Sequence, residues 1–296
     1  MAIGGPMSTP SPWQSFAVAP FGIALTLTLA GCDVGYKVDV RSNTVTWATW
    51  DEGNGRLEWP VVGADAKTFR VMPIRSNTGR QEFGRDNVHL YRESRKIEGA
   101  DPDSFREFGP RLYRDDKSVF RMVYLRGTGR GPQKPGRPDA SPFTIVQLPE
   151  SDPETFRTID SNWSRDAKRV FYVERGFVPR DIDSFEVLSG GWARDRVAIY
   201  FTTSEIPQAD RDTFEVLDRF SPFGKDRAHV FWRGWLIDGA DPMSFEVSKQ
   251  YEGHDDTTNF YFILRDDSVC GPVYPAREML EILRRPIDQN KRHAKP

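Results

Sequence analysis

The chain has 296 residues, of which 38% are hydrophobic, 28% charged and 12% aromatic, and its formal net charge at pH 7 is −2. This hydrophobic content excludes an intrinsically disordered chain, because enough apolar surface is present to form a core. The nearly balanced charge excludes a whole-protein field that would recruit nucleic acid. We therefore expect a globular protein with no nucleic-acid partner.

The N-terminal segment has the composition of a removable signal peptide. Residues 1–31 contain no charged side chain, and an apolar run from Phe16 to Leu29 is followed by Ala30-Gly31-Cys32. A run of about 15 residues is short for a bilayer span but suits the core of a signal peptide. Signal peptides usually have a Lys or Arg before this core, and none is present here. The alternative is a buried strand or helix that happens to end in a cysteine.

The sequence Leu29-Ala30-Gly31-Cys32 resembles the lipobox of bacterial lipoproteins. The resemblance implies cleavage before Cys32, a diacylglycerol on its thiol, and a short linker over residues 32–43. We therefore expect anchoring in the cell envelope, at the periplasmic face of the inner membrane or at the outer membrane. Asp33 resembles an inner-membrane retention signal of some Gram-negative bacteria. Cys270 would then be the sole ordinary thiol, so no intramolecular disulfide is expected.

One motif, Asp-x-x-Ser/Thr-Phe, recurs six times along the rest of the chain. Its phenylalanines are spaced by 36, 51, 29, 29 and 31 residues, which indicates a repeat of about 30 residues. The Asp and Phe positions of the motif are Asp65/Phe69, Asp101/Phe105, Asp152/Phe156, Asp181/Phe185, Asp210/Phe214 and Asp241/Phe245.

A second motif interleaves with the first and consists of a basic residue, then Asp, then an apolar pair beginning four residues after that Asp. It occurs five times, at Arg85-Asp86, Arg114-Asp115, Arg165-Asp166, Arg194-Asp195 and Lys225-Asp226. A large apolar residue precedes each of these aspartates by three positions, as Trp163 precedes Asp166. Because the two motifs occur in the same alternating order five times, the sequence establishes a tandem repeat.

The repeat resembles the DKNYY family of bacterial proteins. The residues that carry the resemblance are Arg165-Asp166-Ala167-Lys168-Arg169-Val170-Phe171-Tyr172 and Gly99-Ala100-Asp101-Pro102-Asp103-Ser104-Phe105. The resemblance covers roughly residues 44–247 and implies a β-rich unit in secreted or envelope proteins. It implies no activity and no functional residues.

The sequence of one unit predicts a β-meander with one helical turn. Asp101-Pro102 is a helix-start pattern, because Asp accepts bonds from free N–H groups and Pro lacks one at the first helical position. Short stretches such as Phe185 to Leu188 have strand composition. We therefore predict an all-β array of repeats in an open elongated stack, with a closed propeller-like ring as the alternative.

The ends of the array and one insertion depart from the repeat. The first copy, from residue 44, is a degenerate hairpin around Asp51 to Gly55, as expected of a capping unit. A Gly/Pro-rich basic loop over residues 125–142 explains the spacing of 51 and is expected to be flexible. Residues 248–296 are predicted to be a degenerate C-terminal cap with a short helix over Ala276 to Arg285 and a frayed tail.

No residue pattern predicts catalysis, a cofactor or a metal. His89 and His229 share one repeat position that Ser118, Arg169 and Ala198 fill elsewhere, so they are expected to be turn residues. The aspartates recur in every repeat, which favours capping and structural hydrogen bonds over a catalytic pair. His254-Asp255-Asp256 is the one local cluster with metal-ligand chemistry, and it is expected first to be a polar loop.

The functional expectation is a lipid-anchored envelope module, not an enzyme, that scaffolds or binds an envelope protein. A cell-wall or glycan binder is the first alternative, and it would require exposed tryptophans in a row. The tryptophans considered for such a platform are Trp47, Trp50, Trp59, Trp232 and Trp235. A hydrolase is the second alternative, and it would require one cleft with convergent polar groups.

Overall fold

The computed structural model describes residues 34–51, 55–74, 81–124, 142–217, 222–249, 251–264 and 280–286, with side chains left out at Asp51 and over 263–264 and 280–286. All regular structure in this part of the chain is β-strand, as predicted, and no helix there could cross a membrane. The predicted signal peptide, Cys32 and Cys270 lie outside the described residues, as does the basic loop except for its last residue, Pro142.

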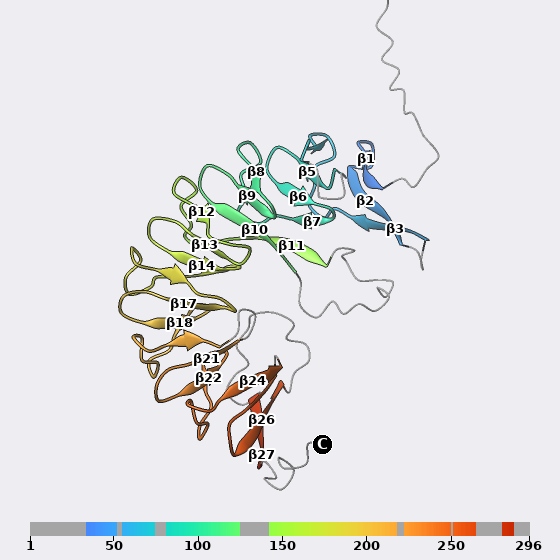
Figure 1. Cartoon of the computed structure of the whole chain (residues 1–296). Coiled ribbons are helices and arrows are strands. Elements are labelled where there is room, and N and C mark those ends of the chain that lie inside the picture. The colour runs from blue at the N-terminus through green and yellow to red at the C-terminus, as the bar shows by residue number, and fades with distance from the viewer. Residues whose placement is uncertain are drawn as a thin grey trace, which may run out of the picture.

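The strands form seven small antiparallel sheets that follow one another along the chain (Figure 1). The first sheet has three strands, β1 (Gly35–Asp39), β2 (Thr44–Asp51) and β3 (Gly55–Pro60). The other six sheets are four-stranded meanders, which we number repeats 1 to 6 in chain order. The arc in Figure 1 is open, with the first and last sheets well apart, so the closed ring is not the arrangement found.

Repeats 1 to 3 contain the following strands. Repeat 1 has β4 (Arg70–Val71), β5 (Phe83–Arg85), β6 (Leu90–Arg92) and β7 (Arg95–Lys96). Repeat 2 has β8 (Arg106–Gly109), β9 (Leu112–Arg114), β10 (Val119–Tyr124) and β11 (Phe143–Gln147). Repeat 3 has β12 (Arg157–Thr158), β13 (Trp163–Arg165), β14 (Val170–Tyr172) and β15 (Arg175–Phe177).

Repeats 4 to 6 follow the same order. Repeat 4 has β16 (Glu186–Val187), β17 (Trp192–Arg194), β18 (Ile199–Phe201) and β19 (Ser204–Glu205). Repeat 5 has β20 (Glu215–Val216), β21 (Phe223–Lys225), β22 (Val230–Trp232) and β23 (Trp235–Leu236). Repeat 6 has β24 (Glu246–Lys249), β25 (Glu252–His254), β26 (Thr258–Leu264) and β27 (Leu280–Pro286).

The ends of the array differ from the sequence expectation in three places. Strand β1 lies inside the segment 32–43, which was predicted to be a linker, and it pairs with β2. The repeat pattern continues past residue 247, because β24 to β27 form a complete sixth repeat. Leu280–Pro286 is strand β27, paired along its whole length with β26, so the helix predicted over Ala276 to Arg285 is wrong across these residues. Apolar spacing in so short a segment does not separate a helix from a strand, and pairing with β26 decides it.

The apolar core lies at the junctions between successive repeats. The Phe of each Asp-x-x-Ser/Thr-Phe motif packs against an aromatic ring of the preceding repeat, as Phe214 packs on Trp192 with ring centroids 4.9 Å apart. Phe223 and Phe245 repeat this contact at 5.8 Å one junction further on. Trp192 and Phe223 are fully buried. Each unit therefore buries its face on its neighbours, which is the physical requirement of a repeat array.

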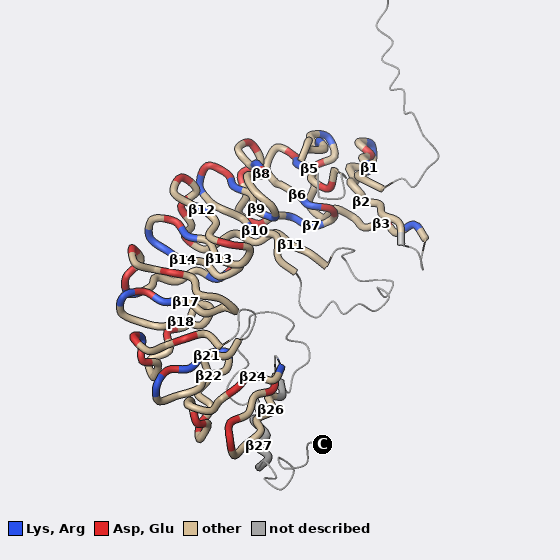
Figure 2. Tube along the Cα trace, viewed as in Figure 1, with Lys and Arg blue, Asp and Glu red and all other residues tan. Residues whose placement is uncertain are grey.

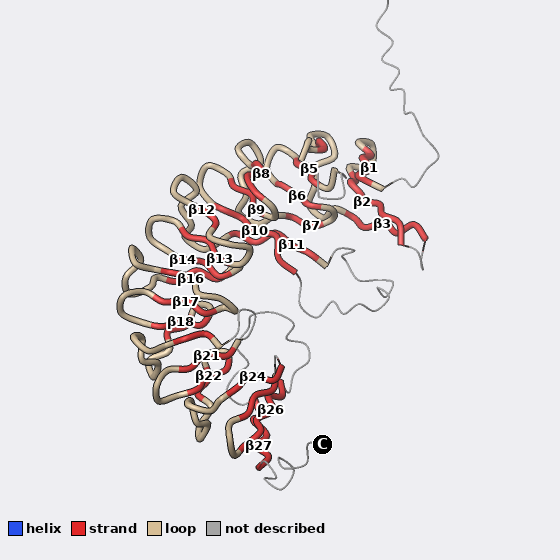
Figure 3. Tube along the Cα trace, in the orientation of Figure 1, coloured by secondary structure: helices blue, strands red, loops and turns tan. Residues whose placement is uncertain are grey.

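Loops and turns occupy much of each repeat between its short strands (Figure 3). Many of the charged residues lie in the turns along the outer side of the arc (Figure 2). The aspartates of both sequence motifs lie outside the strands, in the connecting segments, so the contacts of their carboxylates show whether they have a structural or a chemical role.

Candidate functional site: the repeated polar motifs and the surface they leave

The aspartate of the basic-Asp motif is buried and accepts hydrogen bonds from the backbone; we call it the clasp aspartate. In repeat 4, Asp195 is 1% exposed, and its Oδ1 accepts the N–H groups of Val197 and Ala198, both at 2.7 Å. Its Oδ2 accepts the N–H of Asp181 at 2.8 Å. The carboxylate thus closes its own turn and fastens the preceding motif to it. A buried carboxylate is stable only when its lone pairs are satisfied in this way.

The same arrangement occurs in all six repeats. In each, Oδ2 of the clasp aspartate accepts the N–H of the first residue of the Asp-x-x-Ser/Thr-Phe motif, which we call the cap aspartate. The clasp and cap pairs are Asp86/Asp65, Asp115/Asp101, Asp166/Asp152, Asp195/Asp181, Asp226/Asp210 and Asp255/Asp241, with N–O distances of 2.7–3.1 Å.

The cap aspartate closes the other half of the network. Asp101 accepts the backbone N–H of Asp103 at 3.0 Å and the hydroxyl of Ser104 at 2.8 Å. The Ser104 hydroxyl oxygen in turn accepts the N–H of Asp116, the residue after the clasp aspartate, at 3.3 Å. The Asp and Ser/Thr positions of the motif are therefore occupied by structural hydrogen bonds, and the expected capping role of these aspartates is confirmed.

These contacts govern the pKa values of the carboxyl groups. Burial alone would raise the pKa of Asp86, but the N–H groups of Val88, Asp65 and His89 outweigh it and hold that pKa below its ordinary value. The pKa of Asp255 is lowered against its burial by the same kind of bonds, the first from Asp241. The Asp101 pKa is lowered by the N–H of Asp103 and the Ser104 hydroxyl. Carboxylates held ionised by fixed N–H donors are poorly matched to proton transfer near neutral pH.

The basic residue before the clasp aspartate joins one repeat to the next. Its side chain donates to the backbone carbonyl of the residue after the next cap aspartate: Arg114 donates to Pro153 at 3.0 Å, and Lys225 donates to Pro242 at 2.9 Å. Arg85 and Arg165 make the same contact, with Pro102 and Ile182. Between repeats 4 and 5 the bond reverses, because Arg211 donates to the carbonyl of Asp195. The prediction that the Arg-Asp pairs serve structural hydrogen bonding is confirmed.

Three histidines also occupy positions of the repeated turns and motifs. His89 and His229 each donate their backbone N–H to their clasp aspartate, as residues of other types do at that position. His254 occupies the basic position of repeat 6, and Asp255 is its clasp aspartate, 2% exposed. The described part of the chain holds no group of three or more His, Cys, Asp or Glu side chains placed to bind a metal.

The role of Asp255 as a clasp aspartate was not predicted from the sequence, where it was expected to belong to a polar loop. The basic-Asp motif has a Lys or Arg before the aspartate and an apolar pair after it, whereas repeat 6 has His254 and Asn259-Phe260. A spacing rule would have found it, because Asp255 follows its cap Asp241 by 14 residues, as Asp115 follows Asp101.

The tryptophans do not form an exposed row among the described residues. Trp47 and Trp59 are buried, Trp232 is completely buried, and Trp235 is half-buried. Trp50 is 55% exposed. A glycan-stacking platform made of these five side chains, the geometry that the first alternative required, is therefore not present in this part of the chain.

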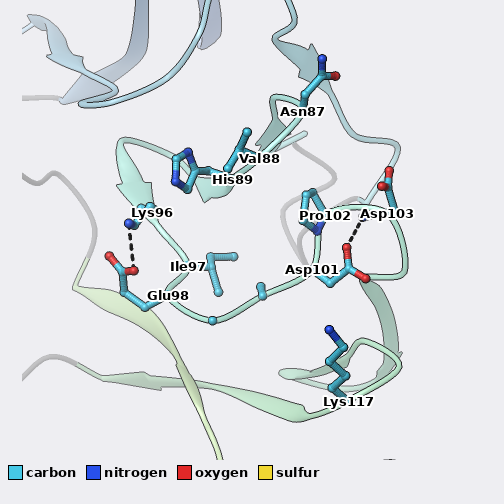
Figure 4. Close-up of a pocket in the computed structure, with 12 residues that line it drawn as sticks. Asn87, Val88, His89, Lys96, Ile97, Glu98, Asp101, Pro102, Asp103 and Lys117 are labelled. Carbon is cyan, nitrogen blue, oxygen red and sulfur yellow. Dashed lines mark hydrogen bonds and ion pairs between the residues drawn. The ribbon is translucent and has the colours of Figure 1, made fainter.

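A hollow of about 620 Å³ lies at the junction of repeats 1 and 2 (Figure 4). Its polar lining includes His89, Lys96, Glu98, Asp101 and Lys117. Lys96 and Glu98 form an ion pair at 2.9 Å, and Asp101 accepts the N–H of Asp103, as the dashed lines in Figure 4 show. Glu98 and Asp101 in this hollow are therefore engaged by neighbouring groups of the chain.

Comparison with known proteins agrees with the repeat. The model of the DKNYY family matches residues 51–192 and 192–269, which together are well over half of the chain. No curated protein and no solved structure shows significant similarity to it. With the motif residues explained by the geometry of the repeats, the chain belongs to the DKNYY family.

Proposed function

We propose that the chain is a lipid-anchored module of the bacterial cell envelope that acts by binding rather than by catalysis. The observation that supports this most is the use of the polar motifs. In six successive repeats the clasp carboxylates accept the N–H of the cap aspartates. The Ser or Thr hydroxyl of each motif donates to the cap aspartate of the same motif. The exposed rim of an open array is then the surface on which a partner can act, as in other repeat proteins that bind along an extended face.

The lipid anchor in this proposal rests on the sequence at Cys32. An apolar segment without charges leads directly to Leu29-Ala30-Gly31-Cys32. A single acyl group holds a protein only marginally, whereas the two chains of a diacylglycerol give stable anchoring. Residues 34 and onward would then stand outside the bilayer, with the first sheet nearest the membrane. We expect an envelope protein or a glycan as the partner.

The anchor is tested by replacing Cys32 with Ala in the full chain and following the protein by membrane fractionation. Wild type is expected in the membrane fraction and Cys32→Ala in the soluble fraction. Cys270→Ala is the matched control, because Cys270 is the other cysteine of the chain and should leave membrane retention unchanged. Membrane retention of Cys32→Ala equal to that of wild type would overturn the anchor.

The binding role is tested by cross-linking in intact cells followed by capture and mass spectrometry. An anchored module is expected to yield a dominant envelope component with the wild type and to lose it with Cys32→Ala. Equal capture by the two forms, or turnover of a wall polymer by the purified chain, would contradict a binding role that depends on the anchor.

A further inference from the structure

The first strand of each repeat is an edge strand, and its exposed charge differs between the two ends of the array. In repeats 1 to 3, an arginine on this strand lies directly opposite the arginine before the clasp aspartate. The facing pairs are Arg70/Arg85, Arg106/Arg114 and Arg157/Arg165. Like charges opposite each other on adjacent strands destabilise a sheet. The same unfavourable pair is therefore present in three successive repeats.

In repeats 4 to 6 the equivalent position of the first strand carries a glutamate instead of an arginine. Glu186 faces Arg194 and is ion-paired with it at 3.0 Å. Glu215 lies 3.6 Å from Lys225, and Glu246 lies 3.8 Å from His254. The C-terminal repeats thus place a carboxylate opposite the basic position, and the N-terminal repeats place an arginine there.

The three edge arginines of repeats 1 to 3 are not needed for the structural network. The facing Arg85, Arg114 and Arg165 reach the next repeat. Arg70 and Arg157 are exposed and make no side-chain hydrogen bond or ion pair with another described residue. Arg106 is exposed, and it donates to the Ser104 carbonyl two residues before it and contacts Asp116, which is itself 70% exposed. We call Arg70, Arg106 and Arg157 the arginine ladder.

We propose that the arginine ladder binds a linear acidic glycan whose negative groups are spaced along the chain. A guanidinium group presents a planar fork of donors that fits a carboxylate or phosphate. The three arginines lie at equivalent positions on successive sheets, and packed sheets are roughly 10 Å apart. Three equivalent rungs engage one polymer together, which strengthens binding beyond any single contact.

The surroundings of the ladder favour a sparsely charged polymer over a dense one. Three exposed acidic side chains lie between these arginines along the chain: Asp103, Glu107 and Glu154. They would repel duplex DNA, which carries a charge about every 1.7 Å, and they would repel a continuous anionic lipid surface. A glycan with widely spaced charges can place its anions on the rungs and its neutral sugars between them. This inference rests on the proposed function, because an envelope module meets such polymers.

The test is binding of hyaluronate fragments, which carry one carboxylate per disaccharide, to the purified full chain at low and physiological salt. Binding is expected to weaken as salt rises, because exposed charge pairs are screened. The Arg70→Ala, Arg106→Ala, Arg157→Ala triple variant is expected to bind at least about tenfold more weakly. Neutral dextran should not bind.

The matched control removes the same three charges from the other end of the array. Arg196, Arg227 and Lys249 are about three-quarters exposed. Their triple Ala variant is expected to change binding less than about threefold. Equal losses in the two triple variants would overturn the ladder, as would equal binding of duplex DNA or of phosphatidylglycerol vesicles.

A gain-of-binding variant keeps the proposal testable if the loss variant misfolds. Replacing Glu186, Glu215 and Glu246 with Arg extends the ladder through repeats 4 to 6, and longer hyaluronate fragments should then bind more tightly. Unchanged binding by this variant contradicts the ladder. The anchor is tested separately by membrane fractionation of Cys32→Ala, so failure of the ladder and failure of the proposed function give different results.

Discussion

Repeats 1 to 3 and repeats 4 to 6 share one internal construction and differ in surface charge. The clasp of repeat 1, at Asp86, and that of repeat 4, at Asp195, accept the same four bonds, from three backbone N–H groups and one tyrosine hydroxyl. The first strand carries Arg70, Arg106 or Arg157 in repeats 1 to 3, whereas it carries Glu186, Glu215 or Glu246 in repeats 4 to 6. The motif therefore fixes the fold of each repeat, while the charge of the edge strand varies.

Acid should remove the largest share of stability, because it acts on several clasp aspartates at once. The pKa values of Asp86, Asp195, Asp226 and Asp255 are lowered in the fold. A lowered pKa stabilises the fold above the ordinary carboxyl pKa of about 4, and this stabilisation is lost as pH falls through the folded-state pKa. We expect acid unfolding below about pH 4, monitored by circular dichroism and hydrogen exchange. If one half stayed folded well below the pH at which the other unfolds, the clasps of the two halves would not be equivalent.

Removing one clasp should be the most damaging single substitution. Asp195→Ala leaves the N–H groups of Asp181, Val197 and Ala198 without their acceptor, at an expected cost of about 3–5 kcal/mol in unfolding free energy. Asp86→Ala should cost the same, measured by urea denaturation. The exposed Asp183→Ala is the control, with an expected change within about 0.5 kcal/mol. A loss at Asp86 much smaller than that at Asp195 would break the equivalence.

A glycine on the second strand of repeats 1 and 5 should give an intermediate loss. A Cβ at Gly84 would lie 2.2 Å from Cζ of Phe69, and one at Gly224 would lie 2.4 Å from Cζ of Phe214. Gly84→Ala and Gly224→Ala should each destabilise the chain by about 1–3 kcal/mol through overpacking. Gly109→Ala in repeat 2 is the control expected to change stability least, because a Cβ there would meet only Leu112, at the ordinary contact distance of 3.8 Å. An unchanged free energy of unfolding in both variants would show that the rings of Phe69 and Phe214 can move aside.

Exchanging the edge charges should give the smallest effect, with opposite signs in the two halves. Arg157→Glu replaces a pair of like charges with an attractive pair and should stabilise the chain by about 0.5 kcal/mol. Glu186→Arg removes the ion pair with Arg194 and should destabilise it by a similar amount. Thermal unfolding at low salt measures both. Changes of the same sign would mean that the facing pairs do not set the stability of the edge.

Much of the fold could be predicted from the sequence because two motifs alternate in a fixed order along the chain. The spacing of Phe185 and Phe214 gave the repeat length, and Asp101-Pro102 gave the turn before each sheet. The structural roles of Asp166 and Arg165 followed from their recurrence. The contacts between motifs could not be predicted, because the bond from the Asp152 N–H to Asp166 joins separate turns. Nor could the facing of Arg157 and Arg165, since two-residue strands carry no register signal.

The most direct measurement is hydrogen exchange of the full chain, followed by mass spectrometry, with and without hyaluronate fragments. We predict slow exchange of the amides two and three residues after each clasp aspartate in all six repeats. We also expect the polymer to slow exchange further around Arg70, Arg106 and Arg157, but not around Glu186, Glu215 and Glu246. Fast exchange at the clasps of either half, or protection by the polymer centred on repeats 4 to 6, would contradict these predictions.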